Sequence, residues 1–221
     1  MKVRVILSGG KLINPIVIIC TEENVNQVNK LINLFTSSPK CNKELSFLSI
    51  TPGIKIDFTR DKWRFQGRWS AQEKEIRVKS NLVLEKMLQT FIFELCNANN
   101  PDLIKKKTNY SNFNTPDEYA LYLEASEHKS FKKAIFLYMD VFLKNPKSLL
   151  MPSAIELDQL RMLADDESYL SYVKNNGHYD YYVDDYNRAT NKKPSFFTKP
   201  KGKNLNEEHY DYDTPQTSIQ G

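Results

Sequence analysis

Four polar side chains near the middle of the sequence have the types and the spacing that acid–base chemistry requires. Glu94 and Asn97 stand three residues apart, and so do Glu124 and Glu127 further along the chain. Side chains at this spacing lie on one face of a helix, so each pair would present its polar groups together. If both pairs met in one cleft, they would supply the acid, the base and the polar anchors of a hydrolytic site.

The first pair belongs to a helix that we expect over residues 82–98. Apolar side chains recur there at the three-and-four spacing of a core-facing stripe: Leu84, Met87, Leu88, Phe91, Ile92, Leu95 and Ala98. The other side of this helix holds Thr90, Phe93, Glu94 and Asn97. Because that side contains an aromatic ring and few polar groups, we expect it to contact another element. Glu94 would then be partly buried and need a partner.

The second pair belongs to the next helix, which begins at a capping box formed by Thr115 and Glu118, with a proline at the first helical position. One face carries Ala120, Leu123, Phe131, Ala134, Tyr138 and Phe142. A rotation of 100° per residue puts Glu124 and Glu127 on this face, which we expect to face the core. Buried acids need hydrogen bonds, cations or protonation, and they often mark a functional site. The alternative is that both acids lie at its margin and pair with lysine or arginine. His128 falls at the edge of the face, where we expect a surface or interhelical histidine.

The stretch Phe93-Glu94-Leu95-Cys96-Asn97 has the spacing of the His-Glu-x-x-His motif, in which two imidazoles hold zinc and the glutamate activates its water. An edge strand expected at 75–78 would shield the cleft in front of this helix. With the glutamates of the next helix, this order of elements resembles the core of the zincin metallopeptidase superfamily across residues 67–127. The resemblance implies a zincin-like core. It also implies that a downstream glutamate, Glu124 or Glu127, stands where zincins often have their third zinc ligand.

Both histidine positions of that motif are filled by other residues in this chain. Phe93 offers no lone pair, and the amide oxygen of Asn97 is a weak zinc ligand compared with imidazole. The sequence therefore predicts no metal and no cofactor, and a degenerate site whose candidate residues are Glu94, Asn97, Glu124 and Glu127. A buried helix with no zincin relationship is the alternative interpretation.

The elements around these residues predict an α+β fold. Strands are expected at 3–7, 16–19, 45–50 and 54–58, and helices from Thr21 to Phe35, over 82–98, from Thr115 to Phe142 and from Ser153 to Val173. Residues 1–80 would thus be sheet-rich and residues 81–190 mainly helical, in a single domain.

Three further segments complete this prediction. Residues 102–114 are polar and rich in lysine and asparagine, and we expect a loop. The tyrosine-rich stretch 179–186 would be either a final packed segment or a surface for a partner peptide. Residues 191–221 are polar and contain prolines, which predicts a disordered tail.

Composition narrows the class of protein. The net charge of +4 comes from many charges of both signs and forms no aromatic-interleaved basic stripe, so we expect no nucleic-acid binding. Three cysteines without paired spacing indicate buried thiols in a reducing compartment. No apolar run is long enough to span a membrane, and the apolar run after Met1 ends too early for a signal peptide. We expect a cytoplasmic protein, or one secreted without a classical cleaved signal peptide.

Three classes of function fit these features. The favoured one is a catalytically inactive zincin-like protein that binds a protein partner, such as a bacterial effector or a toxin- or immunity-associated protein. Catalytic nucleophile motifs and phosphate loops are missing from the sequence, which favours this class. The alternative is a metal-independent or weakly metal-dependent hydrolase with a remodelled site at Glu94, Asn97, Glu124 and Glu127. A structural or regulatory protein without zincin ancestry is the third.

Overall fold

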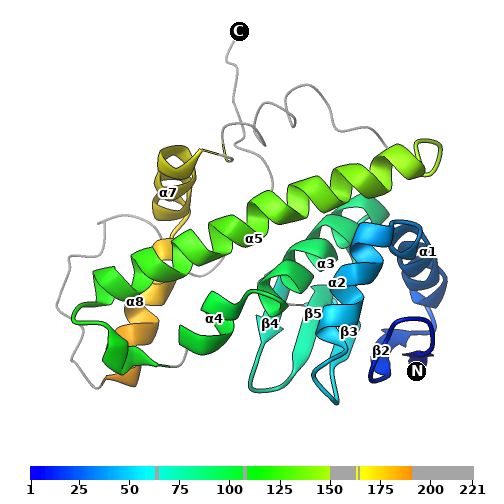
Figure 1. Ribbon diagram of the computed structural model, residues 1–221, viewed down its shortest axis with the longest axis horizontal. Helices are drawn as coiled ribbons and strands as arrows, with labels where there is room; N and C mark the ends of the chain where they lie inside the picture. The colour runs from blue at the N-terminus through cyan, green and yellow to red at the C-terminus, as the bar shows by residue number, and fades with distance from the viewer. Residues whose placement is uncertain (63–64, 107–108, 150–162, 164, 191–221) are drawn as a thin grey trace, which may run out of the picture.

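The computed structural model describes residues 1–62, 65–106, 109–149, 163 and 165–190. A mixed sheet comes first and helices follow, as the sequence predicts (Figure 1). The strands are β1 (Lys2–Leu7), β2 (Ile16–Thr21), β3 (Lys55–Arg60), β4 (Gly67–Ser70) and β5 (Glu75–Lys79). The α-helices are α1 (Val25–Thr36), α2 (Pro39–Leu48), α3 (Leu84–Ala98), α4 (Pro101–Lys106), α5 (Pro116–Lys144), α7 (Asp166–Asn175) and α8 (His178–Ala189). A short 3-10 helix, Tyr110–Asn112, precedes α5.

The five strands form one sheet in the order β1-β2-β3-β5-β4. The inner pairs β2–β3 and β3–β5 are parallel, whereas β1 and β4 run antiparallel to their neighbours. Helices α1 and α2 supply the crossover that a parallel β2–β3 pair needs. The prediction that the strand at 75–78 is the edge strand is wrong. The chain passes beyond that position to form β4 at the edge and returns through a hairpin to place β5 inside the sheet.

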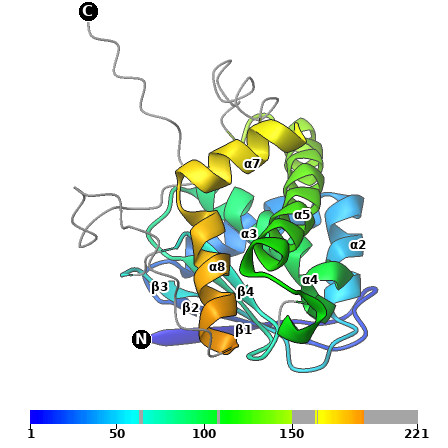
Figure 2. The same ribbon diagram turned by 90° about the vertical axis from the view of Figure 1, so that its left-hand side faces the viewer.

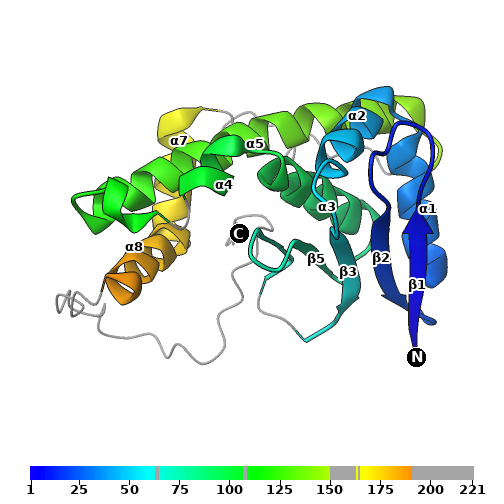
Figure 3. The ribbon, with the colours of Figure 1, turned by 60° about the horizontal axis from the view of Figure 1, so that its bottom comes forward.

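The main core lies between one face of the sheet and the helices above it (Figure 3). Alternate strand residues point into it, such as Ile56 and Phe58 of β3 and Ile76 and Val78 of β5. The apolar stripe predicted for residues 82–98 faces this core, and its largest side chain, Phe91, is fully buried. The helix predicted there is therefore confirmed as α3.

A second, smaller core lies where α4, α5 and α8 meet, and it is built largely from aromatic rings. It contains Leu103, Phe113, Tyr119, Ala120, Leu123, Tyr179, Tyr182 and Tyr186. The tyrosine-rich stretch 179–186 is thus a packed helix, as the first of its two predicted roles requires. Helix α5 spans both cores, and α7 and α8 lie beside one end of it (Figure 2).

Two predictions of local structure are wrong. The apolar run 45–50 is the end of α2 and a turn, because Ser38 caps a helix with Pro39 in its first turn. The expected loop at 102–114 contains α4 and the 3-10 helix. There the Asn100 side chain accepts a hydrogen bond from the Asp102 backbone N–H (3.0 Å).

Most of the other predicted helices are present in the structure. The helices predicted near 21–35, 115–142 and 165–173 are confirmed by α1, α5 and α7. The start of the helix expected from Ser153 and the tail at 191–221 lie outside the described residues. No helix in the described part of the chain combines the length and apolarity that crossing a bilayer requires.

Candidate functional site

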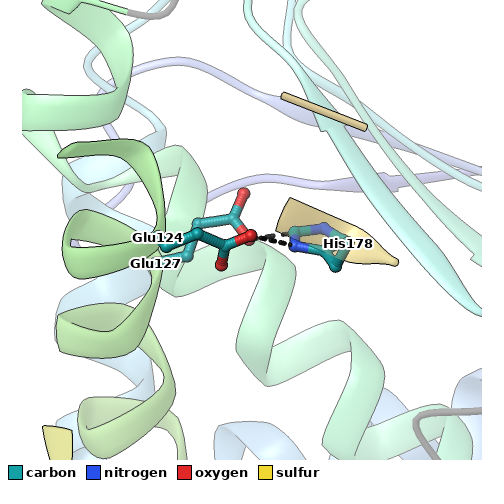
Figure 4. Close-up of side chains that lie close together, drawn as sticks. All are labelled: Glu124, Glu127 and His178. Carbon is teal, nitrogen blue, oxygen red and sulfur yellow. Dashed lines mark hydrogen bonds and ion pairs between the residues drawn. The ribbon is translucent and has the colours of Figure 1, made fainter. Parts of the chain in front are cut away.

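A buried cluster of ionisable side chains forms where α5 meets the start of α8 (Figure 4). Glu124 and Glu127 of α5 are 1% and 5% exposed. The imidazole of His178 lies opposite both of them, with Nδ1 2.8 Å from an oxygen of Glu124 and Nε2 3.8 Å from an oxygen of Glu127. One imidazole therefore faces two buried carboxylates from the neighbouring helix.

Local sequence explains the position of His178. Gly177 adopts a left-handed backbone (φ 78°), which separates α7 from α8 and suits glycine. The side chain of Asn176 accepts a hydrogen bond from the backbone N–H of His178 (3.0 Å). Both features fix the first residue of α8 and so direct its ring towards α5.

Two tyrosines complete the cluster. The hydroxyl of Tyr182, one turn after His178, donates a short hydrogen bond to Glu127. Tyr169 on α7 is buried close to both glutamates. Burial, and then the charges of Glu127 and Glu124, raise the pKa of Tyr169 well above its ordinary value. This phenol therefore stays protonated and uncharged at neutral pH.

The other predicted pair, on α3, is buried as well. Glu94 and Asn97 are 7% and 4% exposed, and the Asn97 amide donates to the Glu94 carboxylate at 3.5 Å. The amide oxygen of Asn97 is buried and has no hydrogen-bond partner in the described part of the chain. Phe93 instead packs its ring edge-on against Phe131 of α5, with the ring centroids 6.4 Å apart.

Strand β4 passes directly over Glu94 at Gly67. A Cβ atom on Gly67 would lie 2.9 Å from a carboxylate oxygen of Glu94 and 2.5 Å from the methyl carbon of Thr90. Such distances are too short for any real side chain, so glycine is what allows the strand to approach α3 this closely. The edge strand therefore covers Glu94.

Helix packing relates the two pairs to each other. Helices α3 and α5 run antiparallel, since Phe93 contacts Phe131 while Asn100 donates to the Ser126 carbonyl (2.8 Å). Between these two contacts lie Asn97 on α3 and the turn of α5 that contains Glu127. The register therefore puts Asn97 and Glu127 on the same stretch of the α3–α5 interface.

The segment that leads into β4 links α3 to α8. The ring of Phe65 packs against Tyr181 of α8 (6.2 Å between centroids), and Tyr181 stacks with His178 at 6.4 Å. The next residue, Gln66, accepts a hydrogen bond from Thr90 of α3 at 3.4 Å. Residues 65–67 therefore run between the surroundings of His178 and those of Glu94.

These positions settle several expectations. Glu124 and Glu127 are buried on the core face as the helical projection predicts, so the alternative that both lie at its margin is wrong. His128 is interhelical rather than superficial: it is 3% exposed, stacks on Tyr169 and contacts Asp166 at 2.9 Å. His178 was not predicted as a site residue. Its contact with Glu124 joins residues 54 positions apart, and no local spacing signals such a contact.

A second feature is a hollow of about 380 Å³ between α2, α4, the end of α3 and the edge strand. Its rim carries Phe47, Ile50 and Ile104, which are 47%, 56% and 45% exposed. Its wall includes the indole of Trp69 from β4, whose Nε1 is buried without an acceptor among the described residues.

One side of the hollow is polar. Lys133 and Glu44 form an ion pair there (2.7 Å), and the Asn99 amide donates to the same carboxylate at 2.9 Å. The hollow therefore combines exposed apolar side chains on its rim with an ordered polar side, as ligand-binding pockets often do.

Comparison with known families, curated proteins and solved structures gives no match for this chain. The zincin resemblance therefore remains a prediction from the residues at 93–97 and from the order of the elements. In the structure, Phe93 and Asn97 occupy the two positions that hold imidazoles in zincins. Phe93 packs against Phe131, and Asn97 donates to Glu94.

Proposed function

We propose that this protein acts by binding an extended segment of a partner protein, on a zincin-like scaffold that does not hydrolyse peptide bonds. The observation that carries the proposal is the hollow beside β4, with Phe47, Ile50 and Ile104 exposed around it. Single exposed apolar side chains are common on protein surfaces, but a group of them around a depression is typical of an interaction site.

The neighbouring strand favours an extended occupant. Strand β4 lies at the edge of the sheet, and in the described part of the chain it pairs with β5 alone. An edge strand offers unpaired backbone N–H and C=O groups, and an extended peptide can add to it while its side chains enter adjacent pockets. Trp69 belongs to this strand and lines the hollow, so a bound segment would contact its indole ring.

Charge favours an acidic sequence in that segment. Arg68, beside Trp69 on β4, is exposed, and Lys74 lies in the turn that joins β4 to β5. Lys133 adds a half-exposed ammonium at the polar side of the hollow. We therefore expect the partner segment to combine a large apolar side chain with flanking carboxylates.

The surroundings of Glu94 support a role without peptide hydrolysis. Phe93 and Asn97 offer no imidazole at the two positions where the zincin resemblance places zinc ligands. The backbone of β4 at Gly67 covers Glu94, which leaves its carboxylate 7% exposed. A general base needs contact with the water or substrate that it deprotonates, and this arrangement favours structural support of β4 instead.

One observation favours the alternative, a hydrolase with a remodelled site. Glu124 and Glu127 converge with His178, and buried acids beside a histidine can transfer protons. The substitution Glu94→Gln separates the two functions. It should abolish a hydrolysis that needs a charged base, but leave binding at the hollow unchanged while the fold persists.

Selection of ligands from a display library of random peptides tests the binding function. Selected peptides, measured by fluorescence anisotropy, should bind at least about tenfold more weakly to Phe47→Asp and Ile104→Asp, because a carboxylate then replaces apolar contact area. Leu143→Asp is the matched control, since Leu143 is an apolar residue of α5 that is 70% exposed and does not line the hollow. Failure to enrich any peptide, or equal affinity for all four proteins, would overturn the proposal.

A further inference from the structure

The cluster at the α5–α8 junction has the composition of a metal site. Glu124, Glu127 and His178 each offer a ligand atom, and these atoms lie within 4.8 Å of one another. Two carboxylate oxygens and an imidazole nitrogen form a ligand set that suits Mn²⁺, Fe²⁺ and Zn²⁺. We infer that Glu124, Glu127 and His178 bind a divalent transition-metal cation that joins α8 to α5.

Distances within the cluster fit such an ion. Ligands about 2.1 Å from one ion lie roughly 3.0–3.4 Å from one another, whether the ion is octahedral or tetrahedral. The gap of 3.8 Å between Nε2 of His178 and Glu127 is too long for a hydrogen bond but close to that separation. Small side-chain rotations would therefore bring the ligand atoms around one ion.

Charge supports the same inference. Two carboxylates that are 1% and 5% exposed carry a large desolvation cost unless positive charge accompanies them. The hydroxyl of Tyr182 donates to Glu127 but is neutral, so it balances neither carboxylate charge. A divalent cation with a neutral imidazole would balance both carboxylates.

The neighbouring groups are arranged as metal ligands require. Tyr182 donates to the Glu127 carboxylate, and such outer hydrogen bonds orient the ligands of metal sites. The helix register puts the Asn97 amide oxygen, buried without a partner in the described residues, on the same stretch of the α3–α5 interface. An oxygen-rich ligand set with one imidazole favours Mn²⁺ over Zn²⁺.

This site differs from the one implied by the zincin resemblance. Neither position 93 nor position 97 supplies an imidazole to this site, and its histidine comes from α8. The sequence predicts no metal because Phe93 and Asn97 replace the two imidazoles of the motif. His128, which is next to Glu127 in the sequence, contacts Asp166 and the Leu163 carbonyl. His178 is distant from the glutamates in the sequence and contacts them only in the folded chain.

Metal binding to the full chain tests the inference. After treatment with a chelator, the protein should bind one Mn²⁺ per chain in equilibrium dialysis with elemental analysis. Its thermal midpoint should then rise by several degrees, because a ligand that binds only the folded state stabilises it. Absence of binding to the wild-type protein at millimolar Mn²⁺ would overturn the inference, whatever the variants do.

Variants locate the site. Glu127→Gln keeps the shape of the side chain and an acceptor for Tyr182, and it should weaken Mn²⁺ binding at least tenfold; His178→Ala should do the same. Glu44→Gln is the matched control, because Glu44 is another buried glutamate (6% exposed) that pairs with Lys133 outside the cluster. Unchanged Mn²⁺ affinity in folded Glu127→Gln protein would overturn the assignment, even if His178→Ala does not fold.

Discussion

Gly67 is the residue at which the edge strand crosses α3, and replacing it by alanine should destabilise the protein. The added methyl would lie 2.5 Å from Thr90 Cγ2, 2.8 Å from Glu94 Cγ and 2.9 Å from Glu94 Oε1. Forcing an extra methyl into a packed site of this kind costs about 1–3 kcal/mol. For a protein of this size, that corresponds to a fall of roughly 2–12 °C in the thermal midpoint.

A double-mutant cycle tests the assigned contact. Thr90→Ser removes the methyl nearest to the added Cβ and keeps the hydroxyl that donates to Gln66. Because the clash is then partly relieved, Gly67→Ala should cost less free energy of unfolding in the Thr90→Ser background than in the wild type. Urea denaturation measures all four proteins. A cost below about 0.5 kcal/mol for Gly67→Ala, or equal costs in both backgrounds, would refute the packing described here.

Three further predictions concern the buried and charged groups. Tyr182→Phe removes a donor from the buried Glu127 carboxylate and should cost about 1–3 kcal/mol in urea denaturation; no measurable cost would show that this hydrogen bond contributes little. The hydrogen bond and charge of Lys132 lower the pKa of Asp166 in the folded protein. The ionised Asp166 carboxylate therefore stabilises the fold above the ordinary aspartate pKa of about 3.9, and this stabilisation is lost as the pH falls through the lower pKa of the folded state. Thermal melts should therefore show Asp166→Asn to be less stable than wild type at pH 7 but equal to it near pH 2, whereas an unchanged difference at both pH values would contradict the ion pair. Burial raises the pKa of Cys96 to about 12, so a disulfide reagent at pH 8 should label it only after unfolding; rapid labelling of the native protein would place this thiol at the surface.

The sequence predicts the site helices well because the relevant signals are local. The capping box at Thr115 fixes the start of α5, and the side chain of Thr115 accepts from the backbone N–H of Glu118. Once that start is known, helical rotation alone puts Glu124 and Glu127 on the buried face. The apolar stripe of α3 is recognisable for the same reason.

Other features depend on contacts between distant residues. Hydrogen bonding between strands determines that β5, and not β4, lies next to β3 in the sheet. The sequence of either short segment is compatible with an edge strand. The apolar run Leu45–Leu48 is too short for its period to distinguish a strand from a helix, and the Ser38 cap decides it. His178 joins the glutamates only because α7 and α8 fold back along α5, and nothing in its own neighbourhood indicates this.

The indole N–H of Trp69 gives the most direct test of the proposed binding function. The chain has two tryptophans, so the nuclear magnetic resonance spectrum should contain two indole N–H signals, and Trp69→Phe assigns one of them. On titration with a selected peptide, the Trp69 signal should shift, because the bound segment contacts the indole ring that lines the hollow. A peptide that binds tightly but leaves the Trp69 signal unchanged, while it perturbs residues elsewhere, would contradict binding at this site.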